Sequence, residues 1–541
     1  DLNIDGGNLV LQGKADTDGA ALSYAALENR GHLTIQASDN AISALNTTLK
    51  VDGATFGSNS TTTFTLNSDG NLTESFIQSS GSIVVENGAS FHVTTLPGIN
   101  ITWNPGNPME LSLMELTGTG DITLGDNTLT VGGLFLTYYK NAHLVHEGNK
   151  ILLKAEEQTD NPYAALADTA NSLAGANLVW GAARSGQVDQ YLTGFLSAIN
   201  DDLINNPGAV SRKMAAAAGS TVTSLSMAQR DALRDQMSWL RNRTNQMGVN
   251  PAYINEDLPY FHMWMQGTGS YAQLDTRGDE SGYKLTTWGG TFGVDVDLSD
   301  SFTLGAAFTA NYGDLTASAA DTADGHLDSY YANLFGRYQS KRWAHTLILT
   351  GGWNDAKLNR TVDYGAGSYR TEGNTNGWGL GAMYELTYDI YLNENKSSIL
   401  QPLFNASVVT TRMDGYRETG AGSMGLNVDK QELTTGTLAL GGRWMGLVGS
   451  NLFGREALAE LRVNAAQDLG DDRGETAVGF LANPGYTQQV RGAKVGRTAL
   501  QIGAGLSVPV GTQGTIFVNG NADIRNGASS LNGSIGYRYD F

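Results

Sequence analysis

The eleven residues from Leu531 to Phe541 constrain the fold more than any other part of the chain. Leu531, Ile535, Tyr537, Tyr539 and Phe541 fall on odd positions, whereas the even positions are polar or very small. Successive side chains of a strand point to opposite faces, so one face of this segment is apolar and aromatic. A soluble sheet would turn such a face to a core. Aromatic residues at the end of the apolar face, however, are typical of a barrel strand that lies between lipid and a water-filled lumen. The pattern predicts the closing strand of a membrane-spanning β-barrel.

The composition of the 541 residues excludes several classes of protein. A formal net charge of −20 makes the chain a poor ligand for nucleic acid, since phosphate contacts need lysine and arginine. The chain has no cysteine, which excludes disulfides and thiolate metal sites, and we expect no cofactor. The chain contains no run of about 18 apolar residues, so no transmembrane helix is predicted. Barrel strands of about 10 semi-polar residues would not appear as such a run. Because the chain begins at Asp1 without a basic signal region, we expect a processed or truncated product, with a secretory signal and further passenger sequence upstream.

Residues 1–160 repeat a short pattern in which glycine precedes alternating apolar residues. Short apolar runs separated by Asn, Asp and Gly predict strands joined by turns. We favour the final coils of a parallel β-helix, capped by the more hydrophobic stretch Leu134–Leu153, and a β-sandwich is the alternative. The pattern starts at Gly7, Gly31, Gly81 and Gly120, with a truncated copy at Gly70.

Residues 161–250 are richer in alanine and predict a helical linker. Tyr163–Trp180 and Gln187–Ile204 have helical composition, and Asn206-Pro207-Gly208 interrupts the run. A second alanine-rich stretch follows the interruption. The change in composition predicts a boundary between the strand-rich part and a linker.

The last helix of the linker is predicted over Met227–Met247, with Gly248 and Pro251 as C-terminal stop signals. Ser226 and Gln229 have the spacing of a capping box. About 20 helical residues span about 30 Å, which is the thickness of a bilayer core.

This helix is too highly charged to face lipid and is predicted to fill a polar pore. Lumen acids such as Glu456 and Glu460 are candidate ion-pair partners for its arginines. The pore-helix residues are Arg230, Arg234, Arg241 and Arg243, accompanied by Asp231 and Asp235.

Residues 251–541 predict a barrel of twelve antiparallel strands. Alternation is clear in the ninth, where Leu461 and Val463 oppose Arg462 and Asn464. An even number of strands places both barrel ends on one side, so the helix before the first strand must thread the pore. The predicted spans are 260–275, 284–298, 302–315, 325–339, 343–358, 374–391, 399–413, 430–446, 455–469, 488–508, 514–525 and 531–541.

The connections between the predicted strands alternate in length. Those after even strands are short, as at Ser299-Asp300-Ser301. Most of those after odd strands are longer: 359–373, 414–429 and 470–487. Short periplasmic turns and long outer loops are the asymmetry expected of an outer-membrane barrel.

These residues resemble those of the autotransporters, the type V secretion proteins. The ending Gly536-Tyr537-Arg538-Tyr539-Asp540-Phe541 is the most specific motif, and the charged helix Arg230–Asp235 is similar to the family's linker helices. The resemblance implies a mainly β fold: a twelve-stranded outer-membrane translocator (251–541), a pore-spanning helix in the linker (161–250) and a β-helical passenger (1–160). It also implies that Tyr537, Tyr539 and Phe541 are read by the barrel assembly machinery.

Self-cleavage of the passenger stays open. Some family members cleave between two adjacent asparagines within the pore helix. Here the pair before the barrel is Asn205-Asn206, upstream of that helix and followed by Pro207, which favours a turn.

Other chemistry finds little support in the sequence. His143 and His146 would point to opposite faces of a strand and chelate poorly, so we expect no metal site. No nucleophile elbow precedes a helix and no phosphate-binding loop occurs, so we expect no enzymatic activity in these residues. Arg277-Gly278-Asp279 in the first outer loop has the composition of an adhesive tripeptide, but also that of an ordinary turn.

The sequence therefore predicts export and surface display of an N-terminal passenger in a Gram-negative-type envelope. The expected partners are outer-membrane lipids, the barrel assembly machinery, periplasmic chaperones and a host surface ligand of the passenger, with no nucleic acid and a monomeric barrel. The alternatives are a passive outer-membrane pore, or an adhesin whose barrel is only an anchor.

Overall fold

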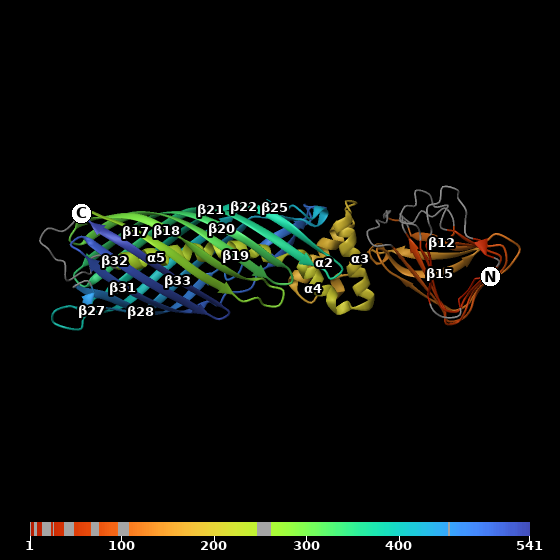
Figure 1. Ribbon diagram of the computed structural model, residues 1–541, viewed down its shortest axis with the longest axis horizontal. Coiled ribbons are helices and arrows are strands. Elements are labelled where there is room, and N and C mark those ends of the chain that lie inside the picture. Colours follow the sequence, from red (N-terminus) through yellow and green to blue (C-terminus); the bar gives the residue numbers. More distant parts are fainter. Residues whose placement is uncertain are drawn as a thin grey trace.

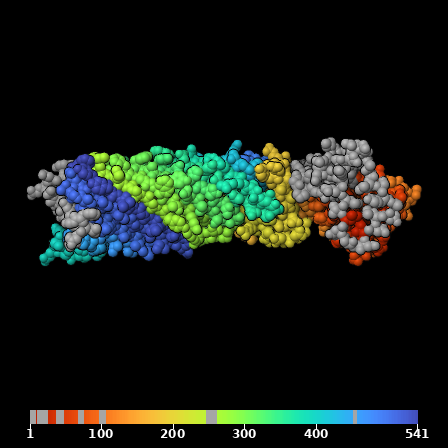
Figure 2. Space-filling model, viewed as in Figure 1, coloured from red at the N-terminus to blue at the C-terminus, as the bar shows by residue number. Residues whose placement is uncertain are grey.

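The computed structural model describes residues 2–4, 8–12, 23–24, 26–36, 48–66, 75–95, 106, 108–245, 261–452 and 455–541. A long barrel is followed along the molecule by a group of helices and then by a smaller region of strands (Figure 1). The three parts lie in line, and the C-terminus is at the barrel end farthest from the helices (Figures 1 and 2).

The N-terminal strands form three sheets in which successive coils pair in parallel. The predicted parallel β-helix is confirmed and the β-sandwich is wrong. The first sheet contains β1 (Leu2–Ile4), β4 (Leu27–Asn29), β7 (Ala54–Phe56), β10 (Ile83–Val85) and β13 (Ile122–Leu124). The second contains β2 (Asn8–Gln12), β5 (His32–Gln36), β8 (Thr61–Leu66), β11 (Ala89–Thr95) and β14 (Asn127–Val131). The third contains β3 (Ser23–Tyr24), β6 (Leu49–Val51), β9 (Ile77–Ser79) and β12 (Met109–Leu116).

Aromatic rings of successive coils pack against each other inside the β-helix. The ring of Phe91 lies 5.6 Å from that of Phe56 and 6.4 Å from that of Phe64, and all three are buried. At the last coil, β16 (Lys150–Glu157) and β15 (Tyr139–Glu147) add in antiparallel order after the short helix α1 (Phe135–Tyr138). The prediction that Leu134–Leu153 caps the β-helix is confirmed.

The linker folds into helices, as predicted, with different boundaries. The predicted Tyr163–Trp180 helix is a 3-10 turn followed by α2, which starts at a capping box formed by Thr169 and Ser172. The break at Asn206 separates α3 from α4. The elements are η2 (Ala164–Leu166), α2 (Ala170–Ala183), α3 (Gln190–Asn205), α4 (Pro207–Ala218), η3 (Ser220–Thr223) and α5 (Ser224–Asn245).

The capping box predicted at Ser226 and Gln229 is wrong. The 3-10 turn η3 leads directly into α5, which therefore begins three residues before the predicted start at Met227. The Ser226 hydroxyl donates to the Thr223 carbonyl at 3.0 Å. Gln229 points into the barrel and donates to Asn354 at 2.8 Å. The predicted stop signals Gly248 and Pro251 lie outside the described residues.

Twelve antiparallel strands close into a barrel through the pairing of β17 with β33. Among the described strands, the two-residue strand β23 (Ile390–Tyr391) pairs only with the start of β24. The barrel strands are β17 (Phe261–Leu274), β18 (Gly282–Ser299), β19 (Phe302–Ser318), β20 (Thr322–Ser340), β21 (Trp343–Asp363), β22 (Ser368–Tyr388), β24 (Ser398–Met413), β27 (Gln431–Leu452), β28 (Arg455–Gly470), β31 (Thr498–Val510), β32 (Gly514–Arg525) and β33 (Ala528–Asp540).

Two predictions at the outer end of the barrel are wrong. The tenth barrel strand begins at Thr498, because Gln488–Arg491 (β30) instead pairs with β29 (Glu475–Phe480) outside the barrel. The connection expected over 359–373 is mostly strand, since β21 runs to Asp363 and β22 starts at Ser368. The strands β25 (Tyr416–Arg417) and β26 (Leu426–Val428), together with β29 and β30, form a small sheet from the two long outer connections.

The barrel is apolar outside and polar inside. On β28, Val463 is 53% exposed whereas its neighbour Arg462 is 2% exposed. Along β21, Trp343 and Trp353 face outward near opposite ends of the apolar band. Ten strand residues rise about 34 Å, or about 26 Å along the barrel axis at the usual tilt, which matches the apolar belt of outer-membrane barrels. Among the described residues, no helix is both long and apolar enough to span a bilayer.

This distribution predicts a depth-dependent cost for charge on the outer face. Val463→Arg, in the middle of β28, should destabilise the folded barrel in lipid vesicles by about 2–4 kcal/mol. Gln467→Arg, four residues along the same exposed face and nearer its end, should cost about 1 kcal/mol or less. Urea unfolding of the two variants in vesicles measures the difference, and equal costs would contradict a lipid-facing position for Val463.

Candidate functional site in the barrel lumen

The helix α5 runs along the barrel lumen (Figure 1) and contacts strands on all sides of it. At its N-terminal end, Gln431 donates to the carbonyl of Val222 at 3.1 Å, beside the outer connections. Near its C-terminal end, Arg243 donates to Asp295 at 2.7 Å, toward the periplasmic turns. The N-terminal end of the helix therefore lies at the outer mouth, and the chain threads the pore as predicted.

One face of α5 is apolar and packs on an apolar patch inside the lumen. Leu233, Met237 and Leu240 have the spacing of one helical face and are buried. Their partners come from neighbouring strands on one side of the barrel: Trp264, Ala307, Tyr331, Phe335, Ile348, Met383 and Val409. This contact fixes which way the helix faces, since an apolar stripe in a polar lumen has only one apolar surface to bury against.

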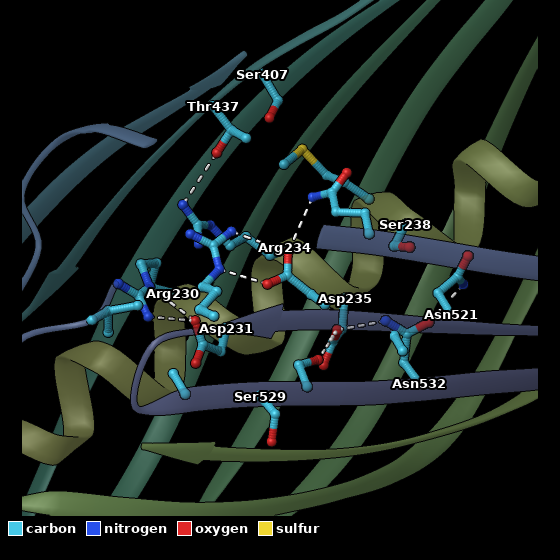
Figure 3. A pocket seen from close by; sticks show the side chains of 18 of the residues that line it. Arg230, Asp231, Arg234, Asp235, Ser238, Ser407, Thr437, Asn521, Ser529 and Asn532 are labelled. Atoms are coloured by element: carbon cyan, nitrogen blue, oxygen red, sulfur yellow. Dashed lines mark hydrogen bonds and ion pairs between the residues drawn. The ribbon is translucent and has the colours of Figure 1, made fainter. Parts of the chain in front are cut away.

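The opposite face of α5 is charged and borders a cavity of about 100 Å³ (Figure 3). Arg234 donates to Asp468 at 2.8 Å and to Thr437 at 3.2 Å. Asn532 on β33 donates to Asp235 at 2.8 Å. The strands β27, β28 and β33 therefore hold the charged face by hydrogen bonds across a partly open space, and β18 adds hydrogen bonds from Tyr283 to Asp231 and from Arg243 to Asp295. Strands from β17 to β24 hold the apolar face by packing.

The four predicted pore-helix arginines all lie in the lumen but differ in their partners. Arg230 pairs with its neighbour Asp231 at 2.7 Å, Arg234 with Asp468, and Arg243 with Asp295. Within the described residues, Arg241 is in no ion pair and donates only to Ser238, at 3.4 Å.

The expected acidic partners Glu456 and Glu460 are not the ones used. Glu460 pairs with Arg462 of its own strand at 3.6 Å, and Glu456 lines a small space with Arg243 at the periplasmic end. Sequence alternation predicts that both acids face the lumen but not how far along the barrel axis they lie. It therefore could not identify Asp295 and Asp468 as the partners of the helix arginines.

A buried ion pair at the outer mouth was missed from the sequence. The guanidinium of Arg360 makes two hydrogen bonds to the carboxylate of Glu418, at 2.8 and 2.7 Å, and neither side chain is exposed. Arg360 also donates to the carbonyl of Ala216 at the C-terminal end of α4, at 3.3 Å. The pair joins β21, the long connection after β24 and the linker helices. Its only sequence signal is two charged residues in segments expected to be loops.

The aromatic residues of the predicted assembly signal lie along the last strand. Tyr537 and Phe541 are exposed on the outside of the barrel, and Tyr539 donates to Gln513 at 2.7 Å. The Phe541 ring lies 5.6 Å from that of Phe261 on the first strand. These side chains therefore sit at the seam that closes the barrel.

Residues of the adhesive-type tripeptide and of the histidine pair contact other parts of the protein. Asp279 of Arg277-Gly278-Asp279 accepts hydrogen bonds from Thr169 through its carboxylate and from Ser220 through its carbonyl, so this acid is turned toward the linker. His143 and His146 each contact a nearby backbone carbonyl, of Asn141 and Gly148. Within the described residues, no group of three His, Asp or Glu could hold a metal ion.

Comparison with known proteins identifies the barrel. Residues 263–521 match the family model described as autotransporter beta-domain. Esterase EstA of Pseudomonas aeruginosa is 31% identical over 211 residues, which are 38% of this chain and 31% of the esterase. An extracellular serine protease of Serratia marcescens is 27% identical over 181 residues, 33% of this chain and 16% of the protease. The chain thus spans less than a third of the length of these curated relatives.

Two solved structures are similar to the barrel region. The translocator domain of NalP from Neisseria meningitidis covers 58% of this chain and 98% of its own, at 15% identity and a TM-score of 0.43. The transport unit of AIDA-I from Escherichia coli covers 57% of this chain and 99% of its own, at 16% identity and a TM-score of 0.38.

Two arginines of α5 provide a matched test of the lumen contacts. Arg243→Met leaves Asp295 buried without its partner and should destabilise the folded protein by about 3–5 kcal/mol. Arg241→Met removes a buried cation that forms no ion pair with any described carboxylate. It should change stability by less than about 1 kcal/mol or increase it. Thermal unfolding of the full chain in detergent compares them, and equal losses would contradict these assignments.

The N-terminal cap of α3 predicts a pH dependence outside the membrane. Partial burial alone would raise the pKa of Asp189, but hydrogen bonds from Ser423 and from the N–H groups of Leu192 and Tyr191 bring that pKa below its ordinary value of 3.8. A lowered pKa stabilises the folded state above the ordinary value, and this contribution is lost as the pH falls through the folded-state pKa.

Asp189→Asn should therefore weaken the docking of α3 at neutral pH by about 1 kcal/mol, because a charge-assisted hydrogen bond becomes a neutral one. Well below pH 3.8 the variant and the parent should dock equally. Hydrogen exchange of α3 amides at increasing urea measures the difference at each pH, and a difference that persists in acid would overturn the assignment.

Proposed function

We propose that this chain, an autotransporter whose β-domain lies in the outer membrane, exports its own N-terminal part through the barrel and displays it on the cell surface, with α5 remaining as a plug. The observation that carries the proposal is the path of the chain. The helix α5 ends near the periplasmic turns, where β17 begins, and starts at the opposite mouth beside the linker helices. The β-helix therefore follows from the outer mouth, as expected of a segment that has passed through the lumen.

Folding outside the cell gives transport its direction under this proposal. The β-helix buries stacked apolar side chains that an extended chain in the lumen would expose, so folding beyond the outer mouth is favourable. The periplasm offers no nucleotide to drive export, and this part of the proposal rests on the resemblance to the autotransporters.

The partners follow from the same proposal. The apolar belt contacts outer-membrane lipids, periplasmic chaperones keep the precursor unfolded, and the barrel assembly machinery reads Tyr537, Tyr539 and Phe541. The barrel acts as a monomer, and the displayed part meets a host surface ligand. The exposed outward position of Tyr537 and Phe541 at the closing seam supports their role in assembly.

The barrel itself is not an enzyme, whereas the activity of the whole protein stays a separate question. The relatives named esterase and extracellular serine protease are more than three times as long as the part matched here. We propose a scaffold role for the β-helix coils, and an activity screen of the full-length precursor tests whether an enzymatic part accompanies them.

Surface proteolysis tests the display. When intact cells carrying the full chain are treated with an external protease, the β-helix and linker should be cut while the barrel strands stay whole. Broken cells provide the control for intrinsic resistance. Protection of residues 1–150 in intact cells, together with cleavage in broken cells, would contradict display.

Single-channel recording separates the plugged translocator from a passive pore. The full chain in a planar bilayer should be almost closed, and deletion of residues 208–250, which removes α4 and α5, should raise its conductance at least tenfold. The barrel of the deletion variant is checked by its heat-dependent mobility on gels. Steady conductance of the intact chain, unchanged by the deletion, favours the passive-pore alternative.

A further inference from the structure

The plug leaves part of the lumen unfilled. The cavity of about 100 Å³ beside the charged face of α5 reaches residues of the outer mouth, among them Leu274, Tyr283, Val495 and Ala528. A cavity of this size with polar walls holds several waters. The helix therefore does not fill the outer part of the lumen, and this end of the cavity is where a cover would act.

The linker helices lie over this end of the barrel (Figure 1) and contact the outer connections. We call α2, α3 and α4 the outer cap. Its members pack closely on each other, since Gly175 of α2 approaches the backbone of Met214 in α4 so tightly that a Cβ at position 175 would overlap it. The outer cap is thus one packed body of helices.

The helix α2 binds the connection between β28 and β31 through Asn171 and, more weakly, through Asn177, which donates to Gln488 at 3.2 Å. The amide of Asn171 accepts from the N–H of Arg491 at 2.9 Å and donates to its carbonyl at 2.9 Å. It also donates to the carbonyl of Asp279 in the first outer connection, at 3.1 Å. Asn171 is 1% exposed and bonds to backbone groups of two connections, of which the carbonyl of Asp279 also accepts from Ser220.

The helix α3 binds the connection between β24 and β27 in a similar way. The carboxylate of Asp189 accepts from the N–H of Ser423 at 2.7 Å and from its hydroxyl at 2.5 Å. The same carboxylate caps α3 by accepting from the N–H of Tyr191 at 3.0 Å. Phe195 of α3 also packs its ring against that of Tyr364 in a third connection, at 5.6 Å.

The outer cap is too wide to pass through the filled lumen. The barrel holds a single helix, which is about 10–12 Å in diameter with its side chains. Three helices packed at about 8–10 Å between axes are at least about 20 Å across. The cap can therefore form only on the side where it is found, and once formed it cannot follow α5 back into the barrel.

We propose that the outer cap is a second, separable closure of the pore that folds at the end of export, and that Asn171 and Asp189 latch it to the outer connections. This inference rests on the proposed export and plugging. It adds that α5 alone does not seal the barrel, and that latching stops the chain from sliding back.

The test compares three forms of the full chain in planar bilayers: the parent, Asn171→Ala/Asp189→Ala, and the matched control Asp201→Ala/Asn205→Ala. The control removes the same residue types from exposed positions of the linker, where the side chains of Asp201 and Asn205 bond to each other and to no other described residue. The latch variant should spend at least ten times longer in conducting states than the parent, whereas the control should behave like the parent. Equal closed times in all three forms would overturn the inference.

A disulfide variant tests the latch within a single protein. The chain has no natural cysteine, so Asp189→Cys/Ser423→Cys introduces a single pair at a position of close contact. The oxidised protein should stay closed and reduction should open it, while reduction of the parent changes nothing. Closure that persists after reduction, with a barrel shown to be folded by its heat-dependent mobility, would also overturn the latch.

Surface proteolysis of the same strains distinguishes this inference from the proposed function. If the parent chain is not displayed, the export proposal fails and the cap has no role in it. If the parent and the latch variant are both displayed but both stay closed, export stands and only the second closure fails. Display together with opening of the latch variant supports both.

Discussion

The structure depends on an inverted distribution of polarity across the barrel wall. Lipid requires apolar side chains outside, and a strand that alternates every residue then turns its polar side chains inward. The lumen consequently collects charged groups such as Arg462, Asp468 and Asp295, each nearly inaccessible to solvent. Such groups are expensive to leave without partners in a confined space. A helix with charges on one face can supply those partners, which is why a charged α5 fits this barrel.

The two faces of α5 play different roles in the same lumen. Packing of Leu233, Met237 and Leu240 on one side of the wall sets the orientation of the helix. Ion pairs at Arg234 and Arg243 set its height along the pore, because each matches a single carboxylate. The cavity on the charged side shows that α5 does not fill the lumen completely. The outer cap completes the closure from outside the membrane under our further inference.

Much of the fold could be predicted from the sequence because its signals are local. Alternation located eleven of the twelve strands to within six residues at each end, and composition located the linker. The tenth strand was extended too far because Gln488–Arg491 alternates like its barrel neighbours, and only pairing with β29 shows that it lies outside. The capping box failed because a 3-10 turn that the pattern does not reveal continues into α5.

The contacts of the candidate site depend on distances along the chain that local patterns do not encode. Arg243 and Asp295 are brought together by the register of β18, and Asn171 meets Arg491 across 320 residues. An odd or even position in a strand indicates which face of the barrel wall a side chain takes, but not how far along the barrel axis it lies. The pore-helix arginines could therefore be named in advance, whereas their partners and the latch of the outer cap could not.

The central claim is that α5 occupies the lumen in intact cells. Gln236 of α5 donates to Thr309 inside the barrel at 2.9 Å, and the chain has no other thiol to interfere with engineered cysteines. A short bifunctional thiol reagent should cross-link Gln236→Cys/Thr309→Cys on living cells. The pair Gln236→Cys/Leu334→Cys should not react, since Leu334 faces lipid. No cross-link in the first pair, with both cysteines open to a bulky aqueous reagent, would contradict the account.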